Sequence, residues 1–449
     1  MLGARFLFER PMSLESHLLS ALAPWRNAPA WRVGFSGGLD STVLLHLLAR
    51  LAQRESLPPL SALHVHHGIQ AAADAWPAHC QGVCDGLGVP LEVLRVRVDA
   101  GASLERAARD ARYSAFIGRL GAGEVLFSAQ HRDDQAETLL FRLLRGAGVR
   151  GLAAMAASRP LGRGSLVRPL LQVSRGELEA FARGQGLSWV EDPSNADTSL
   201  ARNFLRRDIF PALRTRWPRA AEGLARSAEH MAEAQLLLDE LAQADLNTAQ
   251  GCCEFAWLPL PSLDLAPMVA LSPARQRNAL RLWLSAFTPL PDSDHWAGWE
   301  DLRDAAVDAT PIWRLARGEL RRADGRLWWL SGDWLATPAS GLAWSDSRQP
   351  LPLPGNGRLE PLGAPPVGRL EIRYRQGGEV LDVEGRGHRD LKRLFNEARL
   401  PAFVRVRLPL LFVDGQPRAL ANLPGLDGPR EGGWRLRWTP PTNDQGLSW

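Results

Sequence analysis

The chain has 449 residues, more than a single hydrophobic core usually holds, so we expect two or three domains. Hydrophobic residues make up 45% and charged residues 23%, a balance that is typical of globular proteins and excludes wholesale disorder. No apolar run approaches the roughly 18 residues of a membrane span, and the first residues lack the apolar core of a signal peptide. The four cysteines are too few for a disulfide scaffold and lack the spacing of a zinc site. We therefore expect a cytoplasmic protein that has no membrane partner.

The charge is nearly balanced in number but uneven in kind. There are 53 Lys and Arg residues against 49 acids, which gives a net charge of +4. Lys392 is the only lysine, so almost every basic residue is an arginine, whose planar guanidinium binds phosphate in a bidentate manner. The alternative is a genome-wide codon preference that replaces lysine by arginine everywhere, which would produce the same bias. The net charge alone therefore does not identify a nucleic-acid-binding protein.

The first part of the chain, residues 1–215, alternates short strand patterns with longer helical patterns. Strands are expected at 31–38, 60–67, 91–98 and 124–131, and helices at 41–53, 71–88, 103–121 and 133–146. Because strands and helices alternate, the pattern predicts an α/β fold with a parallel sheet and right-handed crossovers.

Two further domains are expected beyond residue 215. Residues 216–350 are rich in Ala, Leu and Arg with few strand signals, which predicts a mainly helical domain. Residues 336–368 are rich in Pro and Gly and predict turns, short strands or a linker. Short strand patterns return around one helix at 389–400, so residues 351–449 are expected to form a small α+β domain.

The strongest motif is Ser36-Gly37-Gly38-Leu39-Asp40-Ser41, between a predicted strand and a predicted helix. The glycines let the backbone turn sharply, and the amides that open the helix favour an anion. The two serines add hydroxyl donors. A plain glycine turn is the alternative, but this context favours a phosphate-binding loop. The lysine of a Walker A loop and the dinucleotide-binding pattern are both absent.

Three histidines follow the second predicted strand. His64 and His66 alternate along the strand and share a face, whereas His67 is expected to point away. This arrangement favours the polar wall of a pocket over a metal site.

Charged residues also cluster on two predicted helices. Arg109 and Arg112 are three residues apart and share a helix face, which suits either a phosphate or solvent. Asp133 and Asp134 lie near the start of the next helix, where acids also serve as ordinary caps. Asp134 and Glu137 are expected to project together, as suits an ammonium group or a base that accepts its proton.

The motif at 36–41 resembles the PP-loop of the N-type ATP pyrophosphatases. The resemblance implies that the loop binds the pyrophosphate of ATP and that cleavage falls between the α- and β-phosphates. It also implies that Asp40 organises magnesium or the reacting phosphate, and that the end of the second strand, with His64, borders the adenine.

The motifs taken together resemble the tRNA(Ile)-lysidine synthetase family. SGGLDST, HVHHGI, ARDARY, HRDDQAETLLFRLLRG, RPLL and EDPSN follow in the family's order between residues 31 and 215. RYRQGGEV, LKRLFNEARL and RLPLLFVDG resemble its C-terminal domain. The resemblance implies that ATP adenylates the oxygen on carbon 2 of the wobble cytidine of the CAU-anticodon isoleucine tRNA. The ε-amine of L-lysine then displaces AMP, which gives lysidine and changes decoding from AUG to AUA.

The resemblance also assigns the site. ATP is expected to contact Ser36, Gly37, Gly38, Leu39, Asp40, Ser41, His64 and His131. Magnesium is expected at Asp40 and Asp133, and catalysis is assigned to Asp40, Arg112, Asp134 and Glu137. Within this set Asp134 and Glu137 are assigned to lysine and Arg112 to phosphate, while the sequence leaves open which of Asp133 and Asp134 takes magnesium and which faces lysine. Under the same resemblance, residues 216–350 form a substrate-binding domain and residues 351–449 a tRNA-binding domain, and arginines from about residue 216 onward are expected to contact the acceptor stem and body of the tRNA. The candidates in the last domain are Arg373, Arg375, Arg386, Arg389, Lys392 and Arg393.

Three other readings remain open. A PP-loop tRNA thiolase is the nearest, although such enzymes commonly use catalytic cysteines. Amide or argininosuccinate synthesis on a small molecule is the second, and an RNA-binding protein with a degenerate loop is the third. A homodimer is also left open.

Overall fold

The computed structural model describes the chain in nine segments: residues 13–68, 71–98, 104–251, 254–291, 294–306, 309–364, 366–383, 385–429 and 433–443. The described residues up to Leu237 form one compact unit, and those from Leu238 onward form a second. The division into three domains at residues 215 and 350 stays a prediction.

The first unit is built on a six-stranded sheet with the order β3-β2-β1-β4-β6-β5. The strands are β1 (Trp31–Gly34), β2 (Leu60–His66), β3 (Leu91–Arg95), β4 (Val125–Phe127), β5 (Ser158–Leu161) and β6 (Gly164–Val167). All neighbours pair in parallel except β5, which is antiparallel to β6. The predicted parallel sheet is confirmed, and the β5–β6 hairpin is an addition to it.

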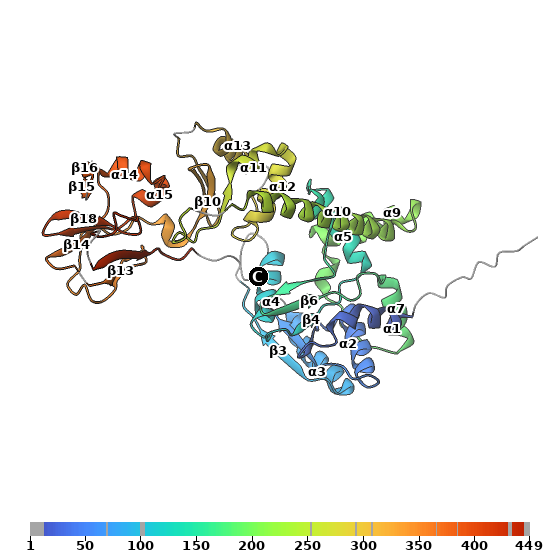
Figure 1. Cartoon of the computed structure of the whole chain (residues 1–449). Coiled ribbons are helices and arrows are strands. Elements are labelled where there is room, and N and C mark those ends of the chain that lie inside the picture. Colours follow the sequence, from blue (N-terminus) through green and yellow to red (C-terminus); the bar gives the residue numbers. More distant parts are fainter. Residues whose placement is uncertain are drawn as a thin grey trace, which may run out of the picture. The chain divides into compact units, whose positions relative to one another are not determined.

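Helices pack around this sheet (Figure 1). They are α1 (Leu14–Leu22), α2 (Leu39–Ala52), α3 (Trp76–Leu87), α4 (Leu104–Ile117), α5 (Arg132–Leu143), α6 (Val149–Leu152), α7 (Arg175–Gly184), α8 (Ala201–Phe204) and α9 (Phe210–Arg216). A π-helical turn at Leu205–Ile209 joins α8 to α9. Helix α2 buries leucines such as Leu44 and Leu48 in the hydrophobic core of this unit. In the same core the rings of Trp31 and Phe127 meet edge to face.

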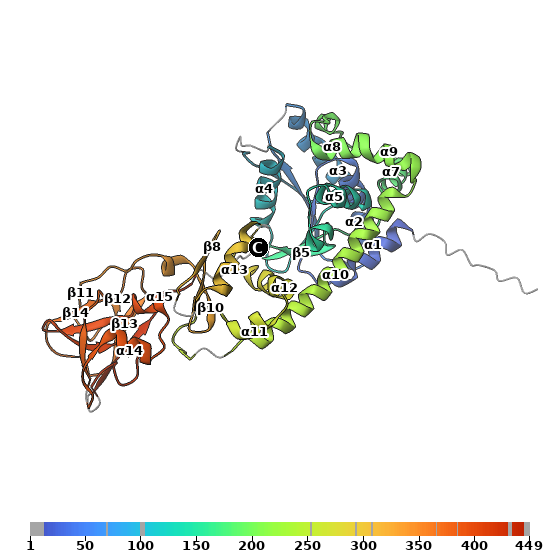
Figure 2. The same cartoon turned by 90° about the horizontal axis from the view of Figure 1, so that it is seen from above.

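Figure 2 shows α10 (Ala220–Ala249) as one long continuous helix. Its residues up to Leu237 belong to the first unit and the remainder to the second. Among the described residues, no helix combines the length and the apolar character that crossing a membrane requires.

The second unit begins with helices and an antiparallel sheet of order β7-β10-β9-β8. Its elements are β7 (Ser262–Asp264), α11 (Leu265–Ala270), α12 (Pro273–Leu284), α13 (Ala297–Asp304), β8 (Ile312–Leu315), β9 (Gly318–Ala323) and β10 (Arg326–Leu330). This sheet differs from the mainly helical domain that the sequence of residues 216–350 predicts. Asp324 and Gly325, with φ of 48° and 70°, form the two-residue hairpin between β9 and β10, and an Asp-Gly pair is a strong hairpin signal.

The rest of this unit holds small antiparallel sheets, as expected. Its elements are β11 (Leu342–Ala343), β12 (Leu351–Pro352), β13 (Arg358–Gly363), β14 (Leu370–Arg373), β15 (Val380–Val383), β16 (Gly387–Asp390), α14 (Leu391–Glu397), α15 (Ala402–Arg405), β17 (Leu410–Val413), β18 (Gln416–Leu420) and β19 (Trp434–Thr439). The predicted helix at 389–400 is α14, which Asp390 caps through the amides of Lys392 and Arg393. Trp334, Trp438 and Phe403 lie in the core.

Candidate active site

A cavity of about 1470 Å³ lies within the first unit, where β1, β2 and β4 end. Its wall includes the loop Ser36–Ser41, the end of β2, one face of α4, the start of α5 and residues 189–196. Ligands of open α/β sheets bind at the carboxyl ends of the strands. The cavity therefore lies where the fold class predicts a binding site.

The loop at the end of β1 is held in shape by its own hydroxyls. The Oγ atoms of Ser36 and Ser41 are 3.0 Å apart, and Ser41 Oγ donates to the carbonyl of Gly38 at 3.0 Å. Gly37 has a φ of 82°, and its carbonyl accepts the amide of Val190 at 2.9 Å. Helix α2 begins directly after Gly38, and no side chain caps it. Its first amides are therefore left without a capping side chain, and uncapped amides at a helix N-terminus can bind an anion.

Two histidines at the end of β2 line the cavity. His64 is 2% exposed; its Nδ1–H donates to the carbonyl of Phe35 at 2.9 Å, and its Nε2 is buried without a partner among the described residues. Burial lowers the pKa of His64, so this nitrogen is an acceptor. His67 also lines the cavity, which strand alternation did not predict, because β2 ends at His66.

His67 makes the stability depend on pH. Burial lowers the pKa of His67 from 6.5 to about 4. The unfolded chain therefore takes up a proton between these values while the folded chain does not, and the free energy of unfolding falls as the pH drops through this window. We expect the variant His67→Asn to lose less stability than the parent when urea unfolding is followed from pH 6.5 down to 4. An identical pH dependence in both proteins would contradict this expectation.

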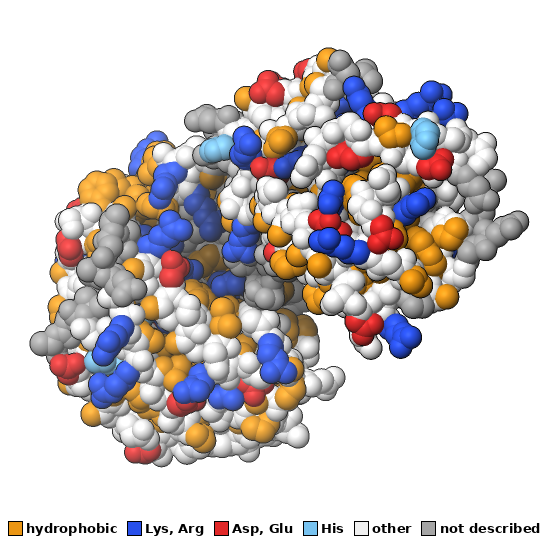
Figure 3. All heavy atoms as spheres, turned by 90° about the vertical axis from the view of Figure 1, so that its left-hand side faces the viewer, with side chains coloured by type: hydrophobic (Ala, Val, Ile, Leu, Met, Phe, Trp, Pro, Cys, Tyr) orange, Lys and Arg blue, Asp and Glu red, His pale blue; other side chains and the backbone are white. Residues whose placement is uncertain are grey.

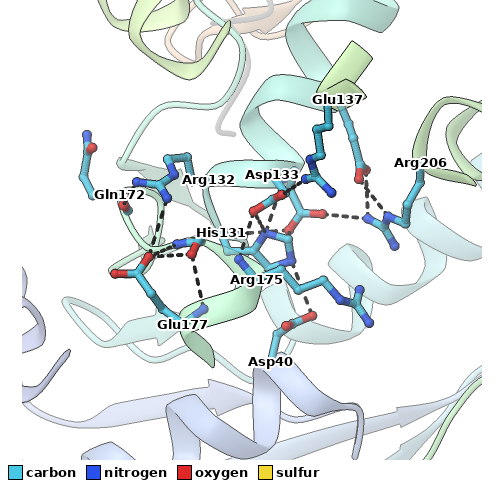
Figure 4. A network of polar contacts seen from close by, with 12 residues as sticks. Asp40, His131, Arg132, Asp133, Glu137, Gln172, Arg175, Glu177 and Arg206 are labelled. Carbon is cyan, nitrogen blue, oxygen red and sulfur yellow. Dashed lines mark hydrogen bonds and ion pairs between the residues drawn. The ribbon is translucent and has the colours of Figure 1, made fainter. Parts of the chain in front are cut away.

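His131 lies at the centre of an acidic cluster (Figure 4). It is 1% exposed, and its Nε2 lies 3.4 Å from Asp134 Oδ2 and 3.6 Å from Asp40 Oδ2. Its Nδ1 accepts the amide of Asp134 at 3.3 Å, so the ring proton is on Nε2, between the two carboxylates. Burial lowers the pKa of His131, but Asp134 and Asp40 outweigh it, and the net shift is upward.

Arg206 clamps the pair of acids that the sequence predicted to project together. Its Nε and Nη2 donate to the two carboxylate oxygens of Glu137 at 2.7 and 2.8 Å, and Nη2 also donates to Asp134 Oδ1 at 3.0 Å. Glu137 is 5% exposed, and burial raises its pKa against the opposing effect of Arg206. The predicted pairing of Asp134 with Glu137 is thus seen, with an arginine of the same chain as the counter-charge.

The two residues predicted to bind magnesium have different surroundings. Asp133 accepts from Arg214 at 2.5 Å and from the backbone amide of Arg175 at 2.9 Å, so it ties α5 to α7 and α9. Asp40 Oδ1 is buried and has no hydrogen-bond partner among the described residues. No group of three or more His, Cys, Asp or Glu side chains in the described parts of the chain could hold a metal ion by itself. Asp40 is therefore better placed than Asp133 to bind a cation whose other ligands are phosphate oxygens.

Arg175 lines the cavity although the sequence analysis did not single it out. Burial raises the pKa of Asp40, but His131 lowers it, and the net shift is downward. The positive charge of Arg175 adds to this lowering. No local pattern marked it, since it is simply the first residue of α7. Arg112, which the sequence did single out, also lines the cavity, and desolvation lowers the pKa of its guanidinium.

The described cysteines do not form a reactive site. Cys80 and Cys84 are buried and free, and burial raises their pKa values to about 12 and about 11. Both are therefore protonated thiols, whereas a nucleophilic cysteine needs a lowered pKa. Cys252 and Cys253 lie outside the described residues.

Family models match three parts of the chain. A PP-loop domain matches residues 12–213, a TilS substrate binding domain matches residues 263–328, and a TilS substrate C-terminal domain matches residues 370–438.

Relatives match nearly the whole chain. The tRNA(Ile)-lysidine synthase of Pseudomonas aeruginosa is 64% identical over 438 residues, which cover 97% of this chain and 99% of the relative. That of Pseudomonas fluorescens is 64% identical over 436 residues, with the same coverage. Among solved structures, the U34-tRNA thiolase NcsA from Methanococcus maripaludis, with its [4Fe-4S] cluster, matches at 18% identity and a TM-score of 0.41 over 49% of this chain and 78% of that one. A likeness at that TM-score carries no argument about function. The identity and coverage of the two relatives show that the chain belongs to the tRNA(Ile)-lysidine synthase family.

Proposed function

We propose that the chain joins L-lysine to carbon 2 of the wobble cytidine of the CAU-anticodon isoleucine tRNA and forms lysidine. Because the chain belongs to the tRNA(Ile)-lysidine synthase family, it is an ATP-dependent ligase that modifies tRNA. One observation supports the chemistry most directly. A single cavity brings together a loop suited to phosphate, an acid with an unpartnered oxygen, and a clamped pair of acids suited to an amine.

The first step is adenylation of the cytidine. The oxygen on carbon 2 attacks the α-phosphate of ATP, and pyrophosphate leaves. The loop Ser36–Ser41 and the first amides of α2 hold the phosphates, while Arg112 and Arg175 offset the charge that develops. Mg²⁺, when bound, adds further positive charge at the phosphates, with Asp40 as its ligand from the protein.

The second step is attack by lysine. The ε-amine is protonated near neutral pH and must lose a proton before it attacks. Asp134 and Glu137 hold the ammonium, and the carboxylate of Asp134, in contact with His131, is positioned to accept its proton. The amine then forms the bond to carbon 2, and AMP leaves with the oxygen.

The variant Glu137→Gln separates the two steps. We expect the KM for lysine to rise about tenfold, because a neutral amide binds an ammonium less well than a carboxylate does. The rate of adenylated tRNA formation without lysine should stay within about twofold, since the amide oxygen of the new side chain still accepts a hydrogen bond from Arg206. Asp208→Asn, in the same π-helical turn as Arg206, is the matched control. Equal loss of both steps would exclude the lysine assignment.

The C-terminal basic residues divide into two groups by their partners. Glu371 pairs with Arg373, and Glu397 pairs with both Arg386 and Arg393. Three others form no ion pair with another described residue: Arg375, Arg389 and Lys392. Figure 3 likewise shows Lys and Arg side chains interspersed with Asp and Glu over one face of the molecule. The unpaired group is therefore the better candidate for binding phosphates of the tRNA body.

Replacing the three unpaired residues by Gln together should weaken tRNA binding about tenfold and make the slope of log affinity against log salt less steep by up to about three. Replacing Arg386 and Arg393, whose charge Glu397 already offsets, should have the smaller effect. Affinity measured over a salt series tests both variants, and ATP binding serves as the internal control. Equal losses in the two variants would contradict the division.

The remaining expectations are part of the same proposal. A thiolase is disfavoured because the described cysteines are protonated. We expect the protein in the cytoplasm, where its tRNA substrate is found. Self-association into a homodimer stays a prediction, for which sedimentation analysis is the measurement.

A further inference from the structure

A second, smaller cavity of about 200 Å³ lies beside the main one. Its lining residues come from α4, α5, α8 and two loops: Arg109, Arg112, Gln130, Asp134, Met155 and Arg202. Arg112, Gln130 and Asp134 line both cavities. A group bound in the small cavity would therefore lie beside a ligand of the large one.

The lining of the small cavity carries an excess of positive charge. Arg109, Arg112 and Arg202 form no ion pair with any residue in the described segments. The one acid of the lining, Asp134, already contacts Arg206 and His131. Three guanidinium groups thus share one small space, and an anion would offset their mutual repulsion.

The residues around these three arginines add further positive charge and do not neutralise it. Arg142 donates to the carbonyls of Gly151 and Ala154, each at 2.8 Å. Its pKa is lowered by burial and then by Arg202 and Arg109, so these cations are close to one another.

Met155, on the wall, is fixed by the side chain of Gln135, which accepts its amide and donates to its carbonyl, both at 2.8 Å. Arg109 lies over the ring of Tyr113 at 4.9 Å. The small cavity is therefore formed before any ligand arrives.

We propose that this small cavity binds a backbone phosphate of the RNA strand beside the reacting cytidine. The proposal rests on the proposed function, because a base that enters the main cavity must leave its stack and bring its own backbone to the rim. The phosphates of ATP have a separate place, since no residue of the loop Ser36–Ser41 lines the small cavity. Planar guanidinium groups suit a phosphate oxygen pair.

A chemical double-mutant cycle tests this assignment without turnover. Full-length CAU-anticodon tRNA is assembled by ligation with one neutral methylphosphonate, either on the 5′ or on the 3′ side of the wobble cytidine. Its affinity is measured for the parent protein and for Arg202→Gln. At one of the two phosphate positions, we expect the methylphosphonate alone and Arg202→Gln alone each to weaken binding about tenfold. Combining the two at that position should weaken binding by less than about a further twofold, because both remove the same contact.

Three controls accompany the cycle. Arg202→Lys keeps the charge but loses the planar guanidinium, so it should restore part of the affinity, which separates loss of charge from loss of folding. Arg106→Gln removes an arginine from the same helix as Arg109, where Arg106 pairs with Asp110 and lines neither cavity, and should bind within about twofold of the parent. The KM for ATP should not change.

Two results would overturn the assignment. Additive losses at both phosphates mean that Arg202 does not contact either of them. A raised KM for lysine with unchanged tRNA affinity would assign the small cavity to the carboxylate of the amino acid. A parent protein that binds the tRNA but attaches no lysine would instead contradict the proposed function and leave this assignment intact.

Discussion

Replacing Gly37 by alanine is expected to abolish ATP-dependent activity while the rest of the fold remains. The φ of Gly37 is 82°, which costs an L-residue about 1–2 kcal/mol. A Cβ atom there would lie 2.9 Å from Cys80 Sγ and 3.1 Å from Val190 Cγ2, so the loop itself must shift. Because the loop amides must hold the phosphates in place, we expect the affinity for a non-hydrolysable ATP analogue to fall at least about tenfold, measured by calorimetry.

The matched control for this change is Gly86→Ala. Gly86 lies inside α3, and a Cβ atom there would meet nothing within 4 Å. Alanine at that site should stabilise the helix by about 0.5–1 kcal/mol and leave ATP binding as it is. Unchanged ATP binding in Gly37→Ala would show that the loop does not contact the nucleotide.

Replacing Arg206 by alanine is expected to have the largest effect on stability. Glu137 would then be a carboxylate in a site that leaves it 5% exposed, with no guanidinium beside it. Removing one partner of a buried ion pair costs about 3–5 kcal/mol, and the lower end of this range is expected here because the Arg206 side chain is 34% exposed. The urea midpoint should therefore fall, and lysine attachment should be lost. With Arg206 absent, its lowering effect on the pKa of Glu137 is lost, so burial and the nearby charge of Asp134 raise that pKa further.

A double variant distinguishes this mechanism from simple loss of packing. Arg206→Ala combined with Glu137→Gln removes the charge that Arg206 neutralises, so it should be less destabilised than the sum of the two single variants. Arg216→Ala, an exposed arginine of α9, is the control and should change stability by no more than about 0.5 kcal/mol. Strict additivity of the two changes would mean that the ion pair contributes nothing.

Local patterns predicted the parts of the site that lie close together in sequence. The phosphate loop, the histidines after β2 and the acids that open α5 each lie within a few residues of one another, where strand and helix geometry fixes their relation. Asp134 and Glu137 were expected to project together for this reason, and both contact Arg206.

Contacts between distant segments could not be predicted in the same way. Arg206 was not among the site residues predicted from the sequence, yet it reaches Glu137 across 69 residues of sequence. Arg206 lies in the π-helical turn at Leu205–Ile209, where the residue spacing of an α-helix does not apply. Arg175 was missed because its position beside Asp40 follows from how α7 packs, and no motif encodes that packing.

The same limit applies to the second unit. Its first sheet was missed although the Asp324–Gly325 turn signals a hairpin, because the Ala-, Leu- and Arg-rich composition around it favoured helices. Tertiary packing around Trp313 and Trp329 decided the outcome.

The most direct test of the whole account is the transfer of radiolabelled L-lysine to tRNA in the presence of ATP and magnesium. The CAU-anticodon isoleucine tRNA is compared with elongator methionine tRNA, which carries the same anticodon. We expect label in the isoleucine tRNA alone, with AMP and pyrophosphate released. Pyrophosphate release that depends on tRNA but leaves no lysine attached would contradict the account and point to another nucleophile, such as the sulfur donor of a thiolase.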